Sequence, residues 1–365
     1  MTTEFSFIDD LGPEKVIEIF DPASGLKAIL VVDNVAAGPA IGGVRMAVDV
    51  TAEECFRLAR AMTLKNAMAG LAHGGGKSVI AADPAMPAAA RSQLIKAFAR
   101  AVADIRDYIP GPDMGTDEHA MAEVKHLIGR AVGLPREVGG IPLDEIGATG
   151  HGLAVALEAA APFCGLNLGE ARVVVQGFGS VGQHAMRFLA ERGARMVGVS
   201  DSGGARICPT GFDLPALLDA KSRGQSVASF EQGHAIDPEE LIAVESEVWI
   251  PAARPDVIRE DNAGRMRTKV VAQGANIPAT PGAEEILAGN DVLVIPDFVA
   301  NAGGVICGAV EYHGGSQSQA METIAERIRG NVTEVLTRAT ADGVLPRVAA
   351  LRIARERVLT AMSFT

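Results

Sequence analysis

Two lysines and an aspartate in the first third of the chain are the residue types that acid–base chemistry needs. Lys77 follows three consecutive glycines in GLAHGGGKS (70–78), Lys65 lies in MTLKNA, and Asp113 lies in GPDMGT. An amine and a carboxylate held together can donate and accept protons during a reaction. Each lysine alone would read as a surface residue, so the prediction of a catalytic site depends on the set.

A second glycine cluster opens the other half of the chain with the sequence Gly177-Phe-Gly179-Ser180-Val181-Gly182. It follows an apolar run and precedes a stretch of helical spacing, which is the context of a dinucleotide-binding turn. Pyrophosphate binds at such a helix N-terminus. Asp201 ends the next expected strand, where a carboxylate accepts hydrogen bonds from the adenosine ribose. The motif therefore predicts NAD rather than NADP, a preference that nearby Arg206 could weaken.

The length and composition are those of a globular protein with two domains. The chain has 365 residues, of which 48% are hydrophobic, and a net charge of −12. That acidity argues against nucleic acid or an anionic membrane as a partner. The four cysteines are widely spaced, so we expect neither a disulfide framework nor a metal site. The first residues, MTTEFSFIDDLGPEK, lack the pattern of a signal peptide, and we expect a cytoplasmic protein.

Hydrophobic periodicity predicts the elements that position these residues. A hairpin is expected first, and a helix that begins at the capping box of Thr51 follows it. After a Gly- and Pro-rich crossing at 139–149, a βαβ unit is expected around the second glycine cluster. The expected strands are 15–21, 26–34, 77–83, 172–176, 195–200, 248–250, 269–272 and 292–295, and the later helices are 88–107, 117–130, 151–164, 317–342 and 347–362. The charged face of the last helix, with Arg347, is expected to be solvated or at a subunit contact.

Seven segments of the chain together resemble the Glu/Leu/Phe/Val dehydrogenase family of amino acid dehydrogenases. The segments begin at residue 38, extend over nearly the whole chain and follow one another in the same order as in the family. The glycine–lysine motif and NAGGV are the motifs specific to this family. The segments are GPAIGGVRM, MTLKNAMAGLAHGGGKSVI, GPDMGTDE, EIGATGHG, VVVQGFGSVGQ, VVAQGANIPATP and IPDFVANAGGV.

The resemblance implies a role for each matching residue. Lys65 and the amides of Gly42 and Gly43 hold the substrate α-carboxylate. Lys77 activates the water that attacks the imino carbon, and Asp113 is the general acid/base at the amino nitrogen. Residues that contact the nicotinamide, its ribose or the substrate are Thr149, Asn276 and Asn301. The implied reaction is oxidative deamination of an amino acid to the 2-oxo acid and ammonia, and its reverse.

The side-chain pocket predicts an apolar substrate. Glutamate-specific members of the family carry a lysine where this chain has Ile41, and commonly have Gln and Ser where it has Met62 and Gly308. Burying a glutamate carboxylate there without a counter-charge would cost several kcal/mol. We therefore expect a branched-chain or aromatic L-amino acid. Glutamate dehydrogenase is the alternative, since VVAQGANIPATP is closer to the glutamate branch, and a non-catalytic regulator that binds nucleotide or amino acid is the rival from another class.

The expected fold is α/β, with two domains around a cleft. We expect a substrate-binding and catalytic domain at 1–145, a doubly wound Rossmann dinucleotide-binding domain at 146–327, and C-terminal helices at 328–365 that return to the first domain. The resemblance also implies a homo-oligomer.

Overall fold

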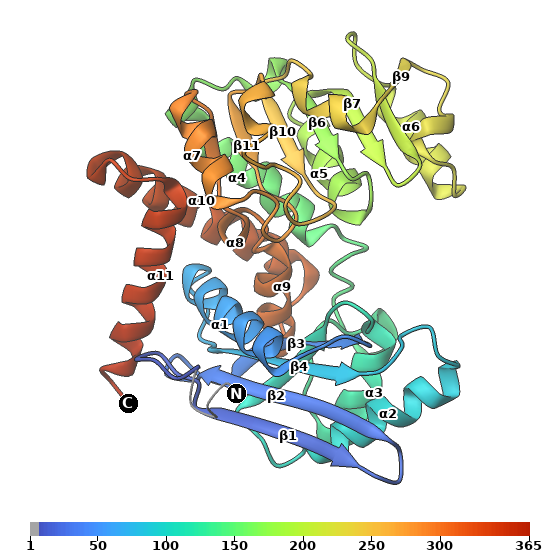
Figure 1. The fold of residues 1–365 in the computed structure, drawn as a ribbon, viewed down its shortest axis with the longest axis vertical. Coiled ribbons are helices and arrows are strands. Elements are labelled where there is room, and N and C mark those ends of the chain that lie inside the picture. Colours follow the sequence, from blue (N-terminus) through green and yellow to red (C-terminus); the bar gives the residue numbers. More distant parts are fainter. Residues whose placement is uncertain (1–6) are drawn as a thin grey trace. The chain divides into compact units, whose positions relative to one another are not determined.

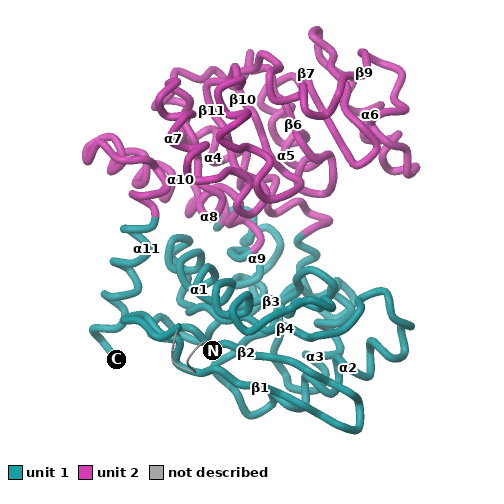
Figure 2. Tube along the Cα trace, viewed as in Figure 1, with its two compact units in different colours: residues 1–143, 305–323, 351–365 teal, residues 144–304, 324–350 magenta. Residues whose placement is uncertain are grey.

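The computed structural model describes residues 7–365, which form two compact units. Unit 1 comprises residues up to 143 together with 305–323 and 351–365, and unit 2 comprises 144–304 and 324–350 (Figure 2). Residues 1–6, where the expected first domain and the stretch considered for a signal peptide begin, lie outside the described part. None of the helices within residues 7–365 is long and apolar enough to span a membrane.

Unit 1 is built on a mixed sheet with the strand order β1-β2-β4-β3-β5. The hairpin strands β1 and β2 pair antiparallel, as does β2 with β4, whereas β3 is parallel to both of its neighbours. The strands are β1 (Lys15–Asp21), β2 (Leu26–Asn34), β3 (Ala40–Ala47), β4 (Gly75–Ala81) and β5 (Tyr108–Pro112). The hairpin was predicted with these limits. Two strands were not predicted: β3, which contains two glycines, and the edge strand β5, which ends in Pro-Gly-Pro.

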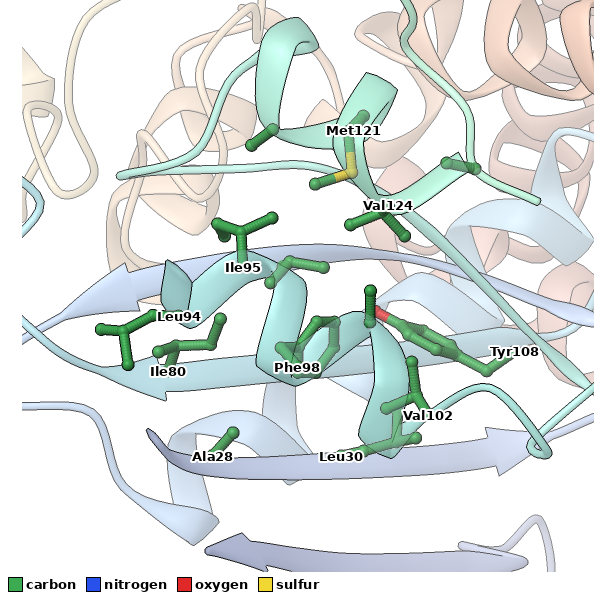
Figure 3. Close-up of a cluster of buried hydrophobic side chains, with 14 of the residues drawn as sticks. Ala28, Leu30, Ile80, Leu94, Ile95, Phe98, Val102, Tyr108, Met121 and Val124 are labelled. Atoms are coloured by element: carbon green, nitrogen blue, oxygen red, sulfur yellow. The ribbon is translucent and has the colours of Figure 1, made fainter. Parts of the chain in front are cut away.

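Helices cover both faces of this sheet (Figure 1). Because side chains alternate along a strand, Val31 of β2 packs with helix α1, whereas its neighbour Leu30 faces helices α2 and α3. Figure 3 shows Phe98 of α2 in the larger of these two clusters. The helices are α1 (Ala52–Met68), α2 (Ala88–Ala101) and α3 (Glu118–Ile128). As predicted, α1 starts at Thr51, whose hydroxyl accepts a hydrogen bond from the amide of Glu54 at 3.1 Å.

Unit 2 contains a sheet with the order β12-β11-β10-β6-β7-β8-β9. The strands from β12 to β7 are parallel, and β8 and β9 extend the sheet antiparallel. The chain order reverses between β6 and β10, which is where open α/β sheets bind their ligands. The strands are β6 (Arg172–Gln176), β7 (Arg195–Asp201), β8 (Gly204–Ile207), β9 (His234–Ile236), β10 (Val248–Pro251), β11 (Val270–Ala272) and β12 (Leu293–Ile295). The predicted doubly wound fold is confirmed.

The helices of unit 2 include α4 and α5, which pack against each other beside β6 and β11. The bounds are α4 (Ala148–Cys164), α5 (Ser180–Ala190), α6 (Leu214–Ser222), α7 (Pro281–Gly289) and α8 (Asp297–Ala300). The last three helices of the chain each contribute residues to both units: α9 (Gly303–Tyr312), α10 (Gln317–Asp342) and α11 (Pro346–Met362). Residues 305–323 thus group with unit 1, whereas the sequence placed them in the second domain.

Phe98 anchors the core between the sheet of unit 1 and its helices, so truncating it tests that packing. We expect Phe98→Ala to lower the free energy of unfolding by about 3–5 kcal/mol, because the ring is fully buried and its removal leaves a cavity. Phe364→Ala is the control, because that ring is 86% exposed. Urea unfolding at a fixed protein concentration measures both variants, and equal shifts would contradict the assignment of the core.

Candidate active site and dinucleotide cradle

Three charged side chains from neighbouring strands meet on the sheet of unit 1. Lys77 extends from β4, Asp113 directly follows β5, and Arg45 lies on β3 between those strands. The Nζ atom of Lys77 is 2.5 Å from Oδ2 of Asp113, and Nε of Arg45 donates to the same oxygen at 3.0 Å. Arg45 also donates to Glu54 at 2.6 Å. The structure therefore brings the predicted amine and carboxylate into contact, and adds an arginine that sequence reasoning missed.

The surroundings of Asp113 keep its carboxylate ionised. Burial by itself would raise the pKa of Asp113, but the nearby charges of Lys77 and Arg45 outweigh it and lower the pKa below its ordinary value. Lys77 is only 5% exposed, so this ion pair lies in a largely desolvated place. Such a pair can pass a proton between its members or to a bound substrate.

The glycines around this site have two different uses. A Cβ on Gly43 would lie 2.7 Å from Cβ of Asp113 and 3.1 Å from Nζ of Lys77, so its absence keeps the ion pair accessible. A Cβ on Gly42 would instead lie 1.7 Å from the carbonyl oxygen of Gly76, and one on Gly75 would lie 2.0 Å from the amide of Thr63. Those glycines permit close packing of β3, β4 and α1.

The C-terminal half of α1 carries two of the predicted substrate residues. Met62 and Lys65 are three residues apart and thus share a helix face, and both are half-buried. The neighbouring Asn66 is fully buried and donates to the carbonyl oxygen of Gly74 at 2.7 Å and to that of Ile41 at 3.4 Å. Asn66 thus ties the helix to β3 and to the glycine run. It was not singled out from the sequence, although it follows Lys65 directly.

Two residues predicted for the apolar wall are buried in unit 1, and their role as a wall stays a prediction. Ile41 is 4% exposed on β3, and Gly308 is buried in α9. A Cβ on Gly308 would lie 3.5 Å from Cβ of Val132, and a Cβ on Gly111 would lie 3.0 Å from Val132 Cγ2. Val132 therefore connects Gly308 with the strand that precedes Asp113. No pattern in the sequence indicated a role for Val132, because its position depends on the loop after α3.

Unit 2 holds the predicted dinucleotide turn. Gly177 has φ of +96°, and a Cβ there would lie 2.6 Å from that of Ala253. A Cβ on Gly182 would lie 2.2 Å from the carbonyl oxygen of Gly177, whereas Gly179 has open space around it. Helix α5 then begins at Ser180, followed by Val181. A tight turn, close packing of helix on strand and an open approach are the three uses that these glycines have in dinucleotide sites, so the residues fit such a cofactor.

A cavity of about 490 Å³ lies beside this turn. It is bordered by Gly177, by Ser200 and Asp201 at the end of β7, and by Arg254 after β10. The Oε1 atom of Gln176, another lining residue, is buried and has no hydrogen-bond partner within residues 7–365. The cavity thus lies at the carboxyl ends of the strands, where an adenosine half would bind.

The carboxylate of Asp201 is fully used within the protein. Its Oδ1 accepts from the amide of Gly203 at 2.9 Å and the hydroxyl of Ser226 at 2.8 Å, and its Oδ2 accepts from Lys221 Nζ at 2.6 Å and the amide of Val227 at 2.8 Å. Burial opposes ionisation, but these hydrogen bonds, led by that of Lys221, lower the pKa of Asp201 to about 2.

Arg206, which was considered as a residue that could weaken the preference for NAD, is used in the same way. Its guanidinium donates to the backbone carbonyls of Ala228, Glu231, Gln232 and Gly233.

The three residues expected near the nicotinamide lie around the first turn of α4. The Nδ2 atom of Asn301 donates to Oδ1 of Asn276 at 3.0 Å and to the carbonyl of Gly274 at 3.3 Å. A Cβ on Gly304 would lie 3.4 Å from Oγ1 of Thr149. Asn301 is buried, whereas Asn276 is exposed. Their predicted contacts with cofactor and substrate stay predictions.

A buried polar network in unit 2 supports this group, and the sequence did not predict it. Arg347 bonds with Glu284 at 2.8 Å and Asp297 at 2.9 Å, and donates to Gln273 at 2.7 Å. Asp297 in turn accepts from the amide of Ile277, the residue after Asn276, at 2.9 Å. The expectation of a solvated face at Arg347 is therefore wrong. An arginine at the start of a helix looks the same in sequence whether it faces water or buried carboxylates.

Comparison with known proteins identifies the same family that the sequence motifs resemble. The family model described as Glutamate/Leucine/Phenylalanine/Valine dehydrogenase matches residues 139–365, and the model of the Glu/Leu/Phe/Val dehydrogenase dimerisation domain matches residues 13–128. The chain belongs to the Glu/Leu/Phe/Val dehydrogenase family. The predicted class of enzyme, an amino acid dehydrogenase acting on a CH–NH₂ group, is thereby confirmed.

Relatives within the Glu/Leu/Phe/Val dehydrogenase family align over most of the chain. Glutamate dehydrogenase from Aeropyrum pernix is 37% identical over 90% of this chain and 84% of its own. NADP-specific glutamate dehydrogenase from Saccharolobus shibatae is 36% identical over 90% of this chain and 82% of its own. The structure of the hetero-hexameric glutamate dehydrogenase from Thermus thermophilus in its leucine-bound form has a TM-score of 0.84 and 31% identity, covering 96% of this chain and 89% of that one.

The ion pair of this family member allows a test by pH. Asp113→Asn leaves Lys77 and Arg45 facing each other, so we expect the free energy of unfolding to fall by about 2 kcal/mol at pH 7. The folded pKa of Asp113 is lowered, so its contribution is present above its ordinary value of 3.8 and is lost as pH falls through the lowered value. Urea unfolding midpoints should therefore differ at pH 7 and converge in acid.

Asp49→Asn is the control, because Asp49 is an exposed aspartate of the same unit. A difference between Asp113→Asn and the unchanged protein that stayed constant down to pH 3 would contradict the role of the two cations.

Proposed function

We propose that this chain catalyses the reversible oxidative deamination of an L-amino acid to the 2-oxo acid and ammonia. The observation that carries the proposal is the desolvated contact of Lys77 and Asp113 at 2.5 Å. Lys65 and the amides of Gly42 and Gly43 bind the substrate α-carboxylate. Unit 1 supplies these groups and unit 2 supplies the dinucleotide cradle. We propose that the catalytic and the dinucleotide-binding roles divide between the two units in this way, with residues 305–323 on the catalytic side.

The residues of unit 1 move the protons of the reaction. A nicotinamide dinucleotide held by the glycine turn of unit 2 would supply the acceptor for the hydride that leaves the substrate Cα. Asp113 takes a proton from the substrate ammonium, so that loss of the hydride from Cα leaves a carbon–nitrogen double bond. Lys77, once it has released its own proton and is the neutral amine, removes a proton from the water that attacks the imino carbon. Asp113 returns its proton to the nitrogen, which leaves as ammonia. An ion pair shielded from water suits these transfers because its members exchange protons without competing solvent.

Glutamate is the substrate that the comparisons support. Glutamate dehydrogenases at 36–37% identity align with nine-tenths of the chain. The cofactor is NAD or NADP, and one of these relatives is NADP-specific. The match to a dimerisation domain also supports the proposal of a homo-oligomer.

An apolar amino acid is the second candidate, favoured by the uncharged residues predicted for the side-chain pocket. That side chain is 4% exposed, and Val132 at 4% and Gly308 offer no charge to a substrate carboxylate. An unpaired carboxylate buried there would be unfavourable by several kcal/mol. Leucine, valine, isoleucine, phenylalanine and tryptophan are the substrates that such a wall accepts.

Lys77→Ala tests the catalytic assignment. We expect turnover to fall by about 10³-fold, because a positioned acid/base typically contributes factors of 10²–10⁴. The affinity for reduced cofactor, measured by fluorescence titration, should stay nearly unchanged since the cradle lies on other elements. Lys96→Ala, which removes a lysine of α2 whose side chain is 44% exposed, is the control. Equal turnover for Lys77→Ala and the unchanged protein would favour a non-catalytic binding protein instead.

Ile41→Lys tests the side-chain pocket. We expect the ratio of kcat/KM for glutamate to kcat/KM for leucine to rise about tenfold or more, because the new cation pairs with the glutamate side chain. Ile41→Leu conserves volume and should leave the ratio nearly unchanged. Initial rates at alkaline pH with both cofactors, over glutamate and the apolar amino acids, give the preference of the unchanged protein. A ratio that does not respond to Ile41→Lys would place the substrate side chain elsewhere.

A further inference from the structure

The carboxylate at the end of β7 has no free acceptor position for the hydroxyls of an adenosine ribose. A carboxylate offers about four acceptor positions, and Asp201 has four donors on its two oxygens, from Gly203, Lys221, Ser226 and Val227. Its side chain is only 9% exposed. A ribose hydroxyl would have to displace one of these internal bonds, so Asp201 provides little of the selectivity for NAD that its position suggested.

Lys221 also changes the charge that a ligand meets at this place. Its ammonium lies 2.6 Å from Oδ2 of Asp201, and the two charges compensate each other. The repulsion that an unpaired carboxylate would exert on a 2′-phosphate is therefore largely removed.

The same cavity contains an arginine that the protein leaves available. Arg254 lines the cavity with Gly177 and Asp201 and is exposed. Within residues 7–365 its side chain has no hydrogen-bond or ion-pair partner.

The other charged groups that line the cavity are arranged differently. Arg259 lies 3.1 Å from Asp261 and 3.8 Å from Glu239, and Asp256 is exposed two residues after Arg254. Arg254 is thus the cation of the cavity that can turn to a ligand without breaking an internal bond. Guanidinium groups bind phosphate through paired hydrogen bonds, which makes this a suitable phosphate contact.

We propose that the cavity accepts a 2′-phosphorylated adenosine, with Arg254 as the residue that binds the 2′-phosphate, so that the protein uses NADP in preference to NAD. This proposal rests on the proposed dehydrogenase function in one respect: it specifies which dinucleotide that enzyme uses. Asp201 and Lys221 then serve as an internal clamp that shapes the β7–β8 turn. The serine hydroxyls of Ser200 and Ser202, which also line the cavity, lie at the same strand end.

Direct binding of NADPH and NADH, which differ in the 2′-phosphate, tests this without turnover. Calorimetric titration of the full chain, with no amino acid, 2-oxo acid or ammonium present, should give a dissociation constant at least fivefold lower for NADPH. Arg254→Ala should reduce this preference to about twofold or less by weakening NADPH alone. Arg254→Lys should restore part of it, because it keeps the charge. Arg265→Ala, which removes an exposed arginine paired with Glu240 outside the cavity, should change neither constant.

Tighter binding of NADH to the unchanged protein would overturn the proposal, as would a preference for NADPH that survives Arg254→Ala. Failure of the proposed function has a different signature. In that case NADPH would bind as described, but no amino acid would be oxidised with either cofactor. If neither NADPH nor NADH bound, both the assignment of the cavity as a dinucleotide site and the role of Arg254 would be wrong.

Discussion

The compensation of one half-buried carboxylate determines much of unit 1. Asp113 is ionised in a desolvated place only because Lys77 and Arg45 face it, and an uncompensated charge there would be strongly unfavourable. Bringing those three groups together requires β4, β3 and β5 to lie side by side in that order. It also requires a residue without a side chain at Gly43, where a Cβ would crowd both partners. Sheet order, register and glycine placement thus serve the same contact.

Unit 2 uses the same principle for a different purpose. Asp201 is compensated by Lys221, and the carboxylates of Glu284 and Asp297 are compensated by Arg347. Each carboxylate also accepts hydrogen bonds from backbone amides or other side chains, and so fixes a loop next to the dinucleotide cradle. Groups whose hydrogen bonds are already complete hold the scaffold, and groups such as Arg254 are left for a ligand.

Local patterns in the sequence predicted the elements that depend on neighbouring residues. The hairpin of β1 and β2, the start of α1 at Thr51 and the βαβ unit around Gly177 all follow from alternation, capping and turn chemistry. β3 and β5 were missed because glycine and proline are poor strand formers. They are stable as strands here because β3 pairs on both sides and β5 is an edge strand, where proline needs no ladder partner.

The sequence by itself determined which residue types are available: an amine, a carboxylate, a glycine turn after a buried strand, and the motifs that identify the family. Only the tertiary structure decided which of them meet and which are already occupied. Arg45 joins Lys77 and Asp113, while Asp201 is closed by Lys221, twenty residues away in the chain. The physical reason is that charge compensation and hydrogen bonding act through space. A side chain's partners, and hence its freedom to bind a ligand, cannot be read from its neighbours in the chain.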